Sequence, residues 1–376
     1  MRKKKVGIIT FHTAVNYGVH LQAFSLVHII KNLGYVPEVI DYRKKTEEVQ
    51  VKFKKILGWL TGFNKIISNK AYNKGKLQIA RRAEFERFDK TYLKLSLYCD
   101  NSEDVKNLSK DYDAVICGSD QIWNPYHTHG NGVFFCESVP SHKRIAYAPS
   151  FGIKELPEGY IEIYTHLIGE IKFISVREEA GRKIVKKITG KDAVVVVDPT
   201  LLVSKQVWKK LASGPNEKMC YENYVLCYLL GEQKYIDTIV EYWSLKGVKV
   251  INISQHKREY KSSDVIELYP SIEEFLYLFE NANFIYTDSY HGVMFSLINE
   301  KDFYVFSRRD TLMDLNSRIE NVLIKLDLMD RVVSNIAEII VEEAHINYQD
   351  VNKIMKNWID ESIKYLKDSL YSVCGE

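Results

Sequence analysis

The chain lacks the features that identify membrane, disulfide-rich and zinc proteins. No apolar run approaches the length needed to cross a bilayer, and the run Val6–Phe11 is too short for the apolar core of a signal peptide. The six cysteines never form a C-x-x-C pair, and Cys117 and Cys227 lie inside apolar strand-like runs. We therefore expect buried thiols in a reducing compartment and a cytoplasmic protein.

The chain also has no large excess of positive or negative charge, and several cofactor motifs are absent. The net charge is only +3, because 52 Lys and Arg nearly balance 49 Asp and Glu, so no nucleic-acid partner is expected. The spaced glycines of a dinucleotide site, a Walker loop and a Ser-His-Asp elbow are not found. His127 and His129 have no nearby carboxylates. We expect neither a cofactor nor a metal.

The length of the chain and its alternation of strand-like and helix-like runs predict two α/β domains. At 376 residues the chain is longer than a single core usually supports. Strand-like and helix-like runs alternate through both halves, which is typical of parallel sheets. We expect an N-terminal domain over 1–203, a linker over 204–220, a C-terminal domain over 221–346, and a helix over 347–376 that could cross back to the first domain. Two such domains would face each other across a cleft.

The most informative stretch lies in the second half. The apolar run Phe284–Tyr286 is followed by Thr287, Asp288 and Ser289, and then by a helical pattern that contains His291. This order predicts a buried strand, a polar turn and a helix N-terminus, where backbone N–H groups favour an anion. The alternative is that Asp288 and Ser289 merely cap the helix.

Cations follow several predicted strands. Arg177 is the first charge after one strand of the first half, and Arg308 and Arg309 follow Phe303–Ser307 in the second. Together with His291 they would suit a ligand that carries a phosphate and a carboxylate, since guanidinium groups bind both. The alternative is local pairing, of Arg177 with Glu178 or Glu179 and of Arg309 with Asp310.

The segment from Lys44 to Lys90 has a different composition. It holds thirteen Lys or Arg against five Asp or Glu, with apolar residues between the cations. Such an insertion, spanning about residues 44–95, could lie on the anionic inner face of the cell membrane. The alternative is a helical insertion that packs its apolar face on the domain, as most apolar stripes do.

Six motifs, in order along residues 6 to 330, resemble those of the polysaccharide pyruvyl transferase family. They are Asn16-Tyr17-Gly18 with Leu21-Gln22-Ala23, Gly118–Pro125, Tyr147–Gly152, Ser175–Glu179, Asp198–Leu202 and Asp288–Gly292. The resemblance implies two Rossmann-like domains similar to those of GT-B glycosyltransferases. It also implies transfer of the pyruvyl group of phosphoenolpyruvate onto two hydroxyls of a polysaccharide or its lipid-linked precursor, which forms a cyclic ketal and releases phosphate.

The resemblance also implies roles for individual residues. Arg177 and His291 would hold phosphoenolpyruvate, and a later cation, Arg309, would assist; Arg308 beside it is a further substrate-binding candidate. Independently of the resemblance, Asn16, Gly18, Ser119 and Ser289 follow predicted strands, and we expect them to contribute to substrate binding.

The family's candidate acid lies just after the first-domain glycine, but here Val19 and His20 follow Gly18. Ketal formation needs a proton donor and a base. The candidates are Asp288 or Asp120 as the base and His20 as the acid.

Two other functions remain open on the same architecture. A sugar-nucleotide glycosyltransferase would depend on a nucleotide sugar and ignore phosphoenolpyruvate. A glycan-binding relative that has lost the acid would bind its ligand without turnover.

The basic insertion generates a first prediction. If it lies on a membrane, the protein should bind vesicles that contain anionic lipid, and the bound fraction in a sedimentation assay should fall as salt rises. Vesicles of neutral lipid are the control. Equal behaviour toward both kinds of vesicle would favour packing on the domain instead.

Overall fold

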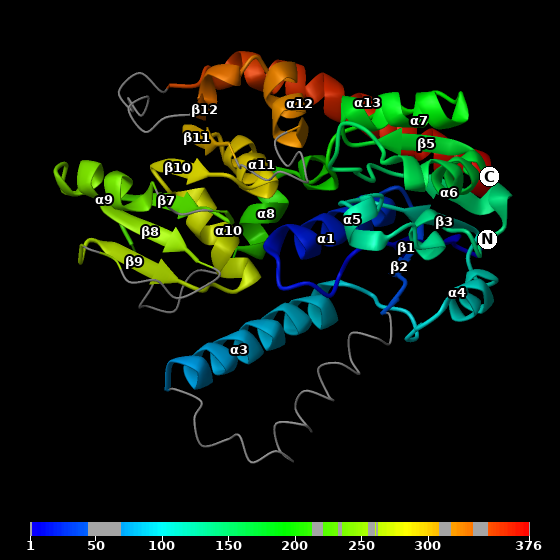
Figure 1. The fold of residues 1–376 in the computed structure, drawn as a ribbon, viewed down its shortest axis with the longest axis horizontal. Coiled ribbons are helices and arrows are strands. Elements are labelled where there is room, and N and C mark those ends of the chain that lie inside the picture. Colours follow the sequence, from blue (N-terminus) through cyan, green and yellow to red (C-terminus); the bar gives the residue numbers. More distant parts are fainter. Residues whose placement is uncertain are drawn as a thin grey trace.

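The structure, a computed structural model, describes residues 2–43, 69–212, 221–231, 235–254, 260, 262–307, 317–333 and 345–375, with the backbone alone for 69–77. The predicted insertion before residue 69 and the cations Arg308 and Arg309 lie outside the described residues. Two six-stranded sheets form the framework (Figure 1). All their strand pairs are parallel.

The first sheet has the order β2-β1-β3-β4-β5-β6. Its strands are β1 (Lys5–Ile9), β2 (Val36–Val39), β3 (Ala114–Cys117), β4 (Arg144–Ala146), β5 (Phe173–Val176) and β6 (Val194–Val195). The order reverses between β1 and β3, and parallel sheets bind ligands at such a reversal, beyond the carboxyl ends of the strands. The predicted residues Asn16, Gly18, Ser119 and Asp120 follow these two strands.

The second sheet has the order β12-β11-β10-β7-β8-β9, the arrangement of a Rossmann fold. Its strands are β7 (Tyr224–Tyr228), β8 (Lys249–Ile253), β9 (Val265–Leu268), β10 (Phe284–Thr287), β11 (Phe303–Phe306) and β12 (Val332–Val333). The reversal here lies between β7 and β10, so the turn that carries His291 leaves the sheet at its ligand-binding edge.

Helices connect these strands and cover the sheets. The α-helices are α1 (Tyr17–Asn32), α3 (Asn69–Tyr92), α4 (Ser102–Ser109), α5 (Pro125–Thr128), α6 (Glu158–Gly169), α7 (Glu179–Thr189), α8 (Lys205–Leu211), α9 (Ile236–Ser244), α10 (Ile272–Asn281), α11 (Tyr290–Asn299), α12 (Ser317–Lys325) and α13 (Tyr348–Cys374). Short 3-10 turns include η4 (Pro199–Leu202) and η6 (Met329–Arg331). The expected α/β class with two Rossmann-like sheets is confirmed.

Local chemistry explains several helix starts. Asn16 caps α1 by accepting a bond from the Gly18 amide at 2.9 Å. Ser271 and Glu274 form a reciprocal capping box at the start of α10. Strand β9 was not predicted, because its residues are only half-buried and lack the apolar run of a central strand.

Helix α13 runs from the second sheet to the first (Figure 1). Its Trp358 donates a hydrogen bond from Nε1 to the Val195 carbonyl at 3.1 Å, and the Val197 amide donates to the Ser362 hydroxyl at 3.0 Å. Lys325 of α12 lies over the Trp358 ring, 5.2 Å from its centre. The helix therefore ties an edge of the first sheet to a helix of the second.

The two halves also meet through α1 and α3. The Tyr17 ring stacks on Phe275 of α10 with 4.3 Å between centroids, and the Tyr17 hydroxyl donates to the Pro270 carbonyl at 2.7 Å. Arg87 of α3 donates to the carboxylate of Glu273 at 2.7 Å. These contacts fix the carboxyl edges of the two sheets relative to each other.

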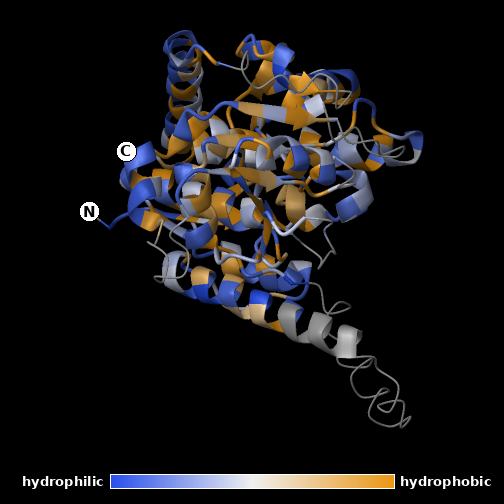
Figure 2. Cartoon of the chain, turned by 90° about the vertical axis from the view of Figure 1, so that its left-hand side faces the viewer, coloured by the Kyte–Doolittle hydropathy of each residue, from blue (hydrophilic) through white to orange (hydrophobic). Residues whose placement is uncertain are grey.

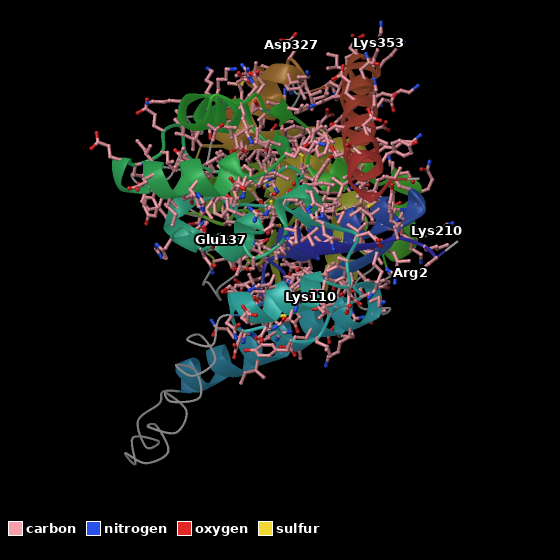
Figure 3. The ribbon with its side chains drawn as sticks, turned by 90° about the vertical axis from the view of Figure 1, so that its right-hand side faces the viewer. Arg2, Lys110, Glu137, Lys210, Asp327 and Lys353 are labelled. Atoms are coloured by element: carbon pink, nitrogen blue, oxygen red, sulfur yellow. The ribbon has the colours of Figure 1, made fainter. Side chains whose placement is uncertain are left out.

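Hydrophobic residues concentrate in the strands and on the inward faces of the helices, and hydrophilic residues lie outside (Figure 2). Charged residues such as Lys110, Glu137 and Lys353 are exposed at the surface (Figure 3). In the part of the chain that the structure describes, no helix combines the length and apolarity that a membrane span requires.

The position of Trp358 generates a second prediction. Trp358→Ala should lower the free energy of unfolding by about 3–5 kcal/mol, because it removes a buried ring that contacts both halves. Denaturant unfolding measures this loss. Tyr371→Ala on the same helix is the matched control, since Tyr371 is 54% exposed and should change stability by no more than about 0.5 kcal/mol. Equal losses would contradict the assigned role of Trp358.

Candidate active site

Arg177 is placed by the end of β5, where its guanidinium is buried. One terminal nitrogen donates a hydrogen bond to the Ser119 hydroxyl and lies 3.0 Å from Oδ2 of Asp198. The other lies 3.7 Å from the Asp120 carboxylate. Burial opposes the positive charge, but Asp198 and the neighbouring groups outweigh it and raise the pKa of Arg177. The guanidinium is therefore a fixed cation at the ligand edge of the first sheet.

Asp198 is the carboxylate that joins the two halves. Its Oδ1 accepts hydrogen bonds from the Thr200 amide at 2.9 Å and the Thr200 hydroxyl at 2.6 Å. Its Oδ2 faces Arg177 and also lies 3.7 Å from Nε2 of His291. Burial alone would raise the pKa of Asp198, but Arg177 and His291 hold it well below its usual range. Asp198 therefore stays ionised beside both groups.

His291 occupies the first turn of α11, which lies between the two sheets (Figure 1). Its ring lies against Gly18 at the start of α1. A Cβ on Gly18 would approach Nδ1 of His291 to 1.9 Å, so a side chain at position 18 would displace the ring. Gly292 has a similar role, because a Cβ there would meet the Thr287 hydroxyl at 2.1 Å. The two glycines let α1, β10 and α11 converge closely.

A second arginine, Arg318, joins the site from the first turn of α12. Both guanidiniums lie over the Tyr290 ring, whose centre is 4.9 Å from Arg177 and 5.5 Å from Arg318. Arg318 is buried, and burial together with the nearby Arg177 lowers the pKa of its guanidinium. Sequence reasoning missed Arg318 as a site residue. Its only signal was its position at the start of a helix in the second half.

These groups leave several polar atoms without hydrogen-bond partners. We call Arg177, Glu178, Asp198, His291 and Arg318 the Arg177 cluster. In the described residues thirteen buried side-chain atoms lack a hydrogen-bond partner, and the cluster supplies six of them: Nε and Nη1 of Arg177, Oε2 of Glu178, Oδ2 of Asp198, Nε2 of His291 and Nε of Arg318. Since buried polar groups are normally paired, this concentration points to a polar ligand.

The structure brings only some of the predicted residues into this cluster. Ser119 and Asp120 contact Arg177, and Gly18 contacts His291. Asn16 caps α1 beside them. Ser289 is the first residue before α11, and its hydroxyl does not cap that helix.

The other two predicted residues, His20 and Asp288, form hydrogen bonds with groups outside the cluster. His20 has both ring nitrogens against acceptors, Asp89 at 2.6 Å and the Ala14 carbonyl at 2.7 Å. The two carboxylate oxygens of Asp288 accept from the backbone amides of Leu230 at 2.6 Å and Gly231 at 2.7 Å. Asp288 thus holds the end of β7 against β10.

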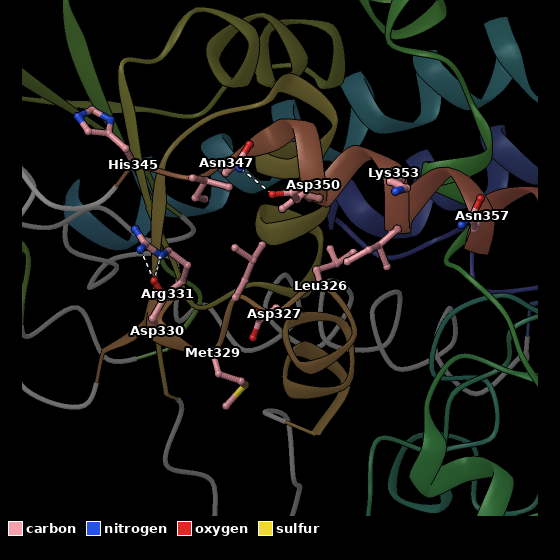
Figure 4. Close-up of a pocket in the computed structure, with 14 residues that line it drawn as sticks. Leu326, Asp327, Met329, Asp330, Arg331, His345, Asn347, Asp350, Lys353 and Asn357 are labelled. Carbon is pink, nitrogen blue, oxygen red and sulfur yellow. Dashed lines mark hydrogen bonds and ion pairs between the residues drawn. The ribbon is translucent and has the colours of Figure 1, made fainter.

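A separate cavity of about 800 Å³ lies where η6 meets the start of α13 (Figure 4). Its walls mix apolar residues with charged ones, including Asp330, Arg331 and Lys353. No residue of the Arg177 cluster lines it, and one unpartnered buried atom, Nη1 of Arg331, belongs to its walls. The Arg177 cluster is therefore the better candidate for an active site.

The described residues contain no group of three or more His, Cys, Asp or Glu side chains placed to hold a metal ion. The cluster combines three cationic or protonatable groups with two carboxyl groups. Its chemistry suits a small, multiply charged anion.

Comparison with known proteins gives one match by sequence family. The model of the family described as polysaccharide pyruvyl transferase matches residues 16–310. These residues include Arg177, Asp198 and His291. No curated protein matches the chain in sequence.

Solved structures share the fold at low sequence identity. The UDP-GlcNAc 2-epimerase from Neisseria meningitidis bound to UDP-GlcNAc is similar with a TM-score of 0.53 and 12% identity, over 98% of this chain and 99% of that one. A UDP-N-acetylglucosamine 2-epimerase is similar with a TM-score of 0.58 and 12% sequence identity, over 99% of this chain and 96% of that one. Arabidopsis thaliana UGT89C1 complexed with UDP-L-rhamnose is similar with a TM-score of 0.53 and 12% sequence identity, over 100% of each chain. These similarities confirm the expected GT-B-like fold.

The contact between Gly18 and His291 generates a third prediction. Gly18→Ala should displace the His291 ring and cost about 1–3 kcal/mol of stability, because the new Cβ overlaps the imidazole. Denaturant unfolding and the imidazole NMR signals report the two effects. Gly159→Ala in α6 is the matched control, since a Cβ there meets nothing within 4 Å. If Gly18→Ala leaves the His291 signals unmoved, the proposed contact is wrong.

Proposed function

The chain belongs to the polysaccharide pyruvyl transferase family, and on that premise we propose that it transfers the pyruvyl group of phosphoenolpyruvate onto two hydroxyls of a sugar. The product is a cyclic ketal, and phosphate is released. The observation that carries the proposal is the Arg177 cluster, in which two arginines and a histidine have buried nitrogens without hydrogen-bond partners.

Phosphoenolpyruvate fits the charge of this cluster. It carries a phosphate and a carboxylate on the same carbon atom, C2, and a guanidinium binds either group through two parallel hydrogen bonds. In our proposal Arg177 and Arg318 hold the two anionic groups, and His291 adds a donor beside the N-terminus of α11. Arg308 and Arg309 follow β11 in sequence and remain proposed as additional cations.

The cluster would also help the reaction itself. Departure of phosphate builds negative charge on its oxygens, and fixed cations stabilise that charge without rearranging. Asp198 keeps Arg177 and His291 in place through its ionised Oδ2. Asp120, 3.7 Å from Arg177, is the proposed base for a sugar hydroxyl.

The acceptor is proposed at the level of class. The family name points to a polysaccharide or its precursor. A lipid-linked acceptor would place the enzyme at the inner face of the cell membrane, where the basic insertion could contact anionic lipid. Both the acceptor and this location are proposals.

The decisive experiment measures phosphate release from phosphoenolpyruvate with a panel of lipid-linked and nucleotide-linked sugars. We expect release with at least one acceptor, and binding of phosphoenolpyruvate by calorimetry. Turnover of a nucleotide sugar without phosphoenolpyruvate would favour a glycosyltransferase instead. Binding of glycans with no turnover of either donor would favour a non-catalytic relative.

The two arginines generate a fourth prediction. Arg318→Lys should weaken phosphoenolpyruvate binding about tenfold or more, because an ammonium cannot make two parallel hydrogen bonds. His291→Ala should weaken it as well. Calorimetry measures both. Arg177 is left intact because its removal would leave Asp198 buried without its main partner.

Arg182→Lys is the matched control for Arg318→Lys. Arg182 pairs with Glu179 on the surface of α7, where its side chain is 42% exposed. We expect unchanged affinity in this variant. Unchanged affinity in Arg318→Lys would remove Arg318 from the proposed pocket.

A further inference from the structure

Glu178 is a fully buried carboxyl group inside the Arg177 cluster. It directly follows Arg177 and precedes α7, yet its side chain does not cap that helix. Its Oε1 instead accepts hydrogen bonds from the Ser150 hydroxyl at 3.1 Å and from the backbone amides of Phe151 at 2.9 Å and Gly152 at 3.4 Å. Three donors therefore fix one oxygen of the carboxyl group.

The other oxygen, Oε2, is buried and has no hydrogen-bond partner. An ionised carboxylate normally accepts hydrogen bonds at both oxygens, and leaving one bare in the interior is costly. A neutral carboxyl group avoids most of that cost. Because the donors all converge on Oε1, the proton of the neutral form belongs on Oε2.

The charged and titratable groups around Glu178 come from three elements. Arg318 of α12 and Arg177 at the end of β5 both favour the ionised form, while Tyr290 of α11 lies close enough to interact with the carboxyl. Burial outweighs the two arginines and raises the pKa of Glu178 above its ordinary value. The neutral form is thus more favourable in the folded protein than for an exposed glutamate, although two cations lie nearby.

The other candidates for a proton donor are either held in the ionised form or already bound to hydrogen-bond partners elsewhere. Asp198 has its pKa held well below the usual range. Both nitrogens of His20 already face acceptors, the Asp89 carboxylate at 2.6 Å and the Ala14 carbonyl at 2.7 Å. Both oxygens of Asp288 accept from backbone amides. Val19 offers no acid at the position after Gly18.

We propose that Glu178 is the general acid of the reaction and that its Oε2–H protonates C3 of phosphoenolpyruvate. This inference rests on the proposed function. The O–H bond breaks, the electron pair of the C2=C3 double bond forms the new C–H bond, and C2 becomes open to attack. The first sugar hydroxyl adds to C2 and gives its proton to Asp120, the proposed base. Phosphate then leaves C2, and the second hydroxyl adds to C2 and gives its proton to Glu178, which restores the carboxyl group. The proton held by Asp120 goes to the released phosphate.

The test compares Glu178→Gln with wild-type protein. The amide keeps an oxygen that can accept the three hydrogen bonds but carries no acidic proton. We expect the rate of phosphate release to fall about 10²–10⁴-fold, while phosphoenolpyruvate affinity by calorimetry changes by less than about threefold. The fall of kcat at high pH that reflects ionisation of Glu178 should also disappear. Retained activity with an unchanged pH profile would overturn the proposal.

A stability measurement tests the neutral state without any substrate. The pKa of Glu178 is raised by folding, so wild-type stability should decline as pH rises from about 4, where the unfolded carboxyl ionises, through the folded pKa. Glu178→Gln should therefore gain stability relative to wild type over that range and match it below about pH 4. No such gain would contradict a neutral Glu178.

Glu179→Gln is the matched control for both measurements. Its hydrogen bond with Arg182 lowers the pKa of Glu179, so this variant should lose stability above about pH 4 and keep full activity. If wild-type protein neither binds phosphoenolpyruvate nor releases phosphate, the proposed function fails. If wild type is active and Glu178→Gln is equally active, only the role of Glu178 fails.

Discussion

The interaction on which the site depends is the contact of one buried carboxylate, Asp198, with Arg177 and His291. The two partners come from different sheets, and neither is hydrogen-bonded to the other. A buried carboxylate needs a nearby cation, because removing it from water without one costs several kcal/mol. Asp198 therefore requires Arg177 beside it, and the same oxygen lies 3.7 Å from His291 of the second half, so this carboxylate links the two halves.

That arrangement is supported at three other places. Tyr17 stacks on Phe275, Arg87 of α3 reaches Glu273 of α10, and α13 returns to the first sheet through Trp358. Each contact joins elements that lie far apart in the sequence. The absence of a side chain at Gly18 then allows His291 to reach the first sheet. The site is consequently formed by the two sheets together and not by either one alone.

The proposal of Glu178 as the acid draws on both the family relationship and the local environment of its carboxyl group. The chain keeps the arginine and histidine expected of its family but has Val19 where an acid was expected. A buried glutamate next to Arg177 supplies a carboxyl group in the same cluster. Enzymes commonly obtain an acid and a stable anion from two carboxyls by giving them different surroundings. Asp198 and Glu178 have such different surroundings, since cations dominate around the first and burial around the second.

The sequence by itself determined the alternation of strands and helices, the class of fold and the residues that follow each strand. The polar turn and the helix start after Phe284–Tyr286 are local features, so the order of apolar and polar residues was enough to predict them. Tertiary structure decided which of those residues meet. Arg318 and Glu178 belong to the cluster, whereas His20 pairs with Asp89, because charges and burial depend on neighbours that only folding brings together. A pattern of period two or 3.6 identifies the buried face of an element but contains no information about the partner across it.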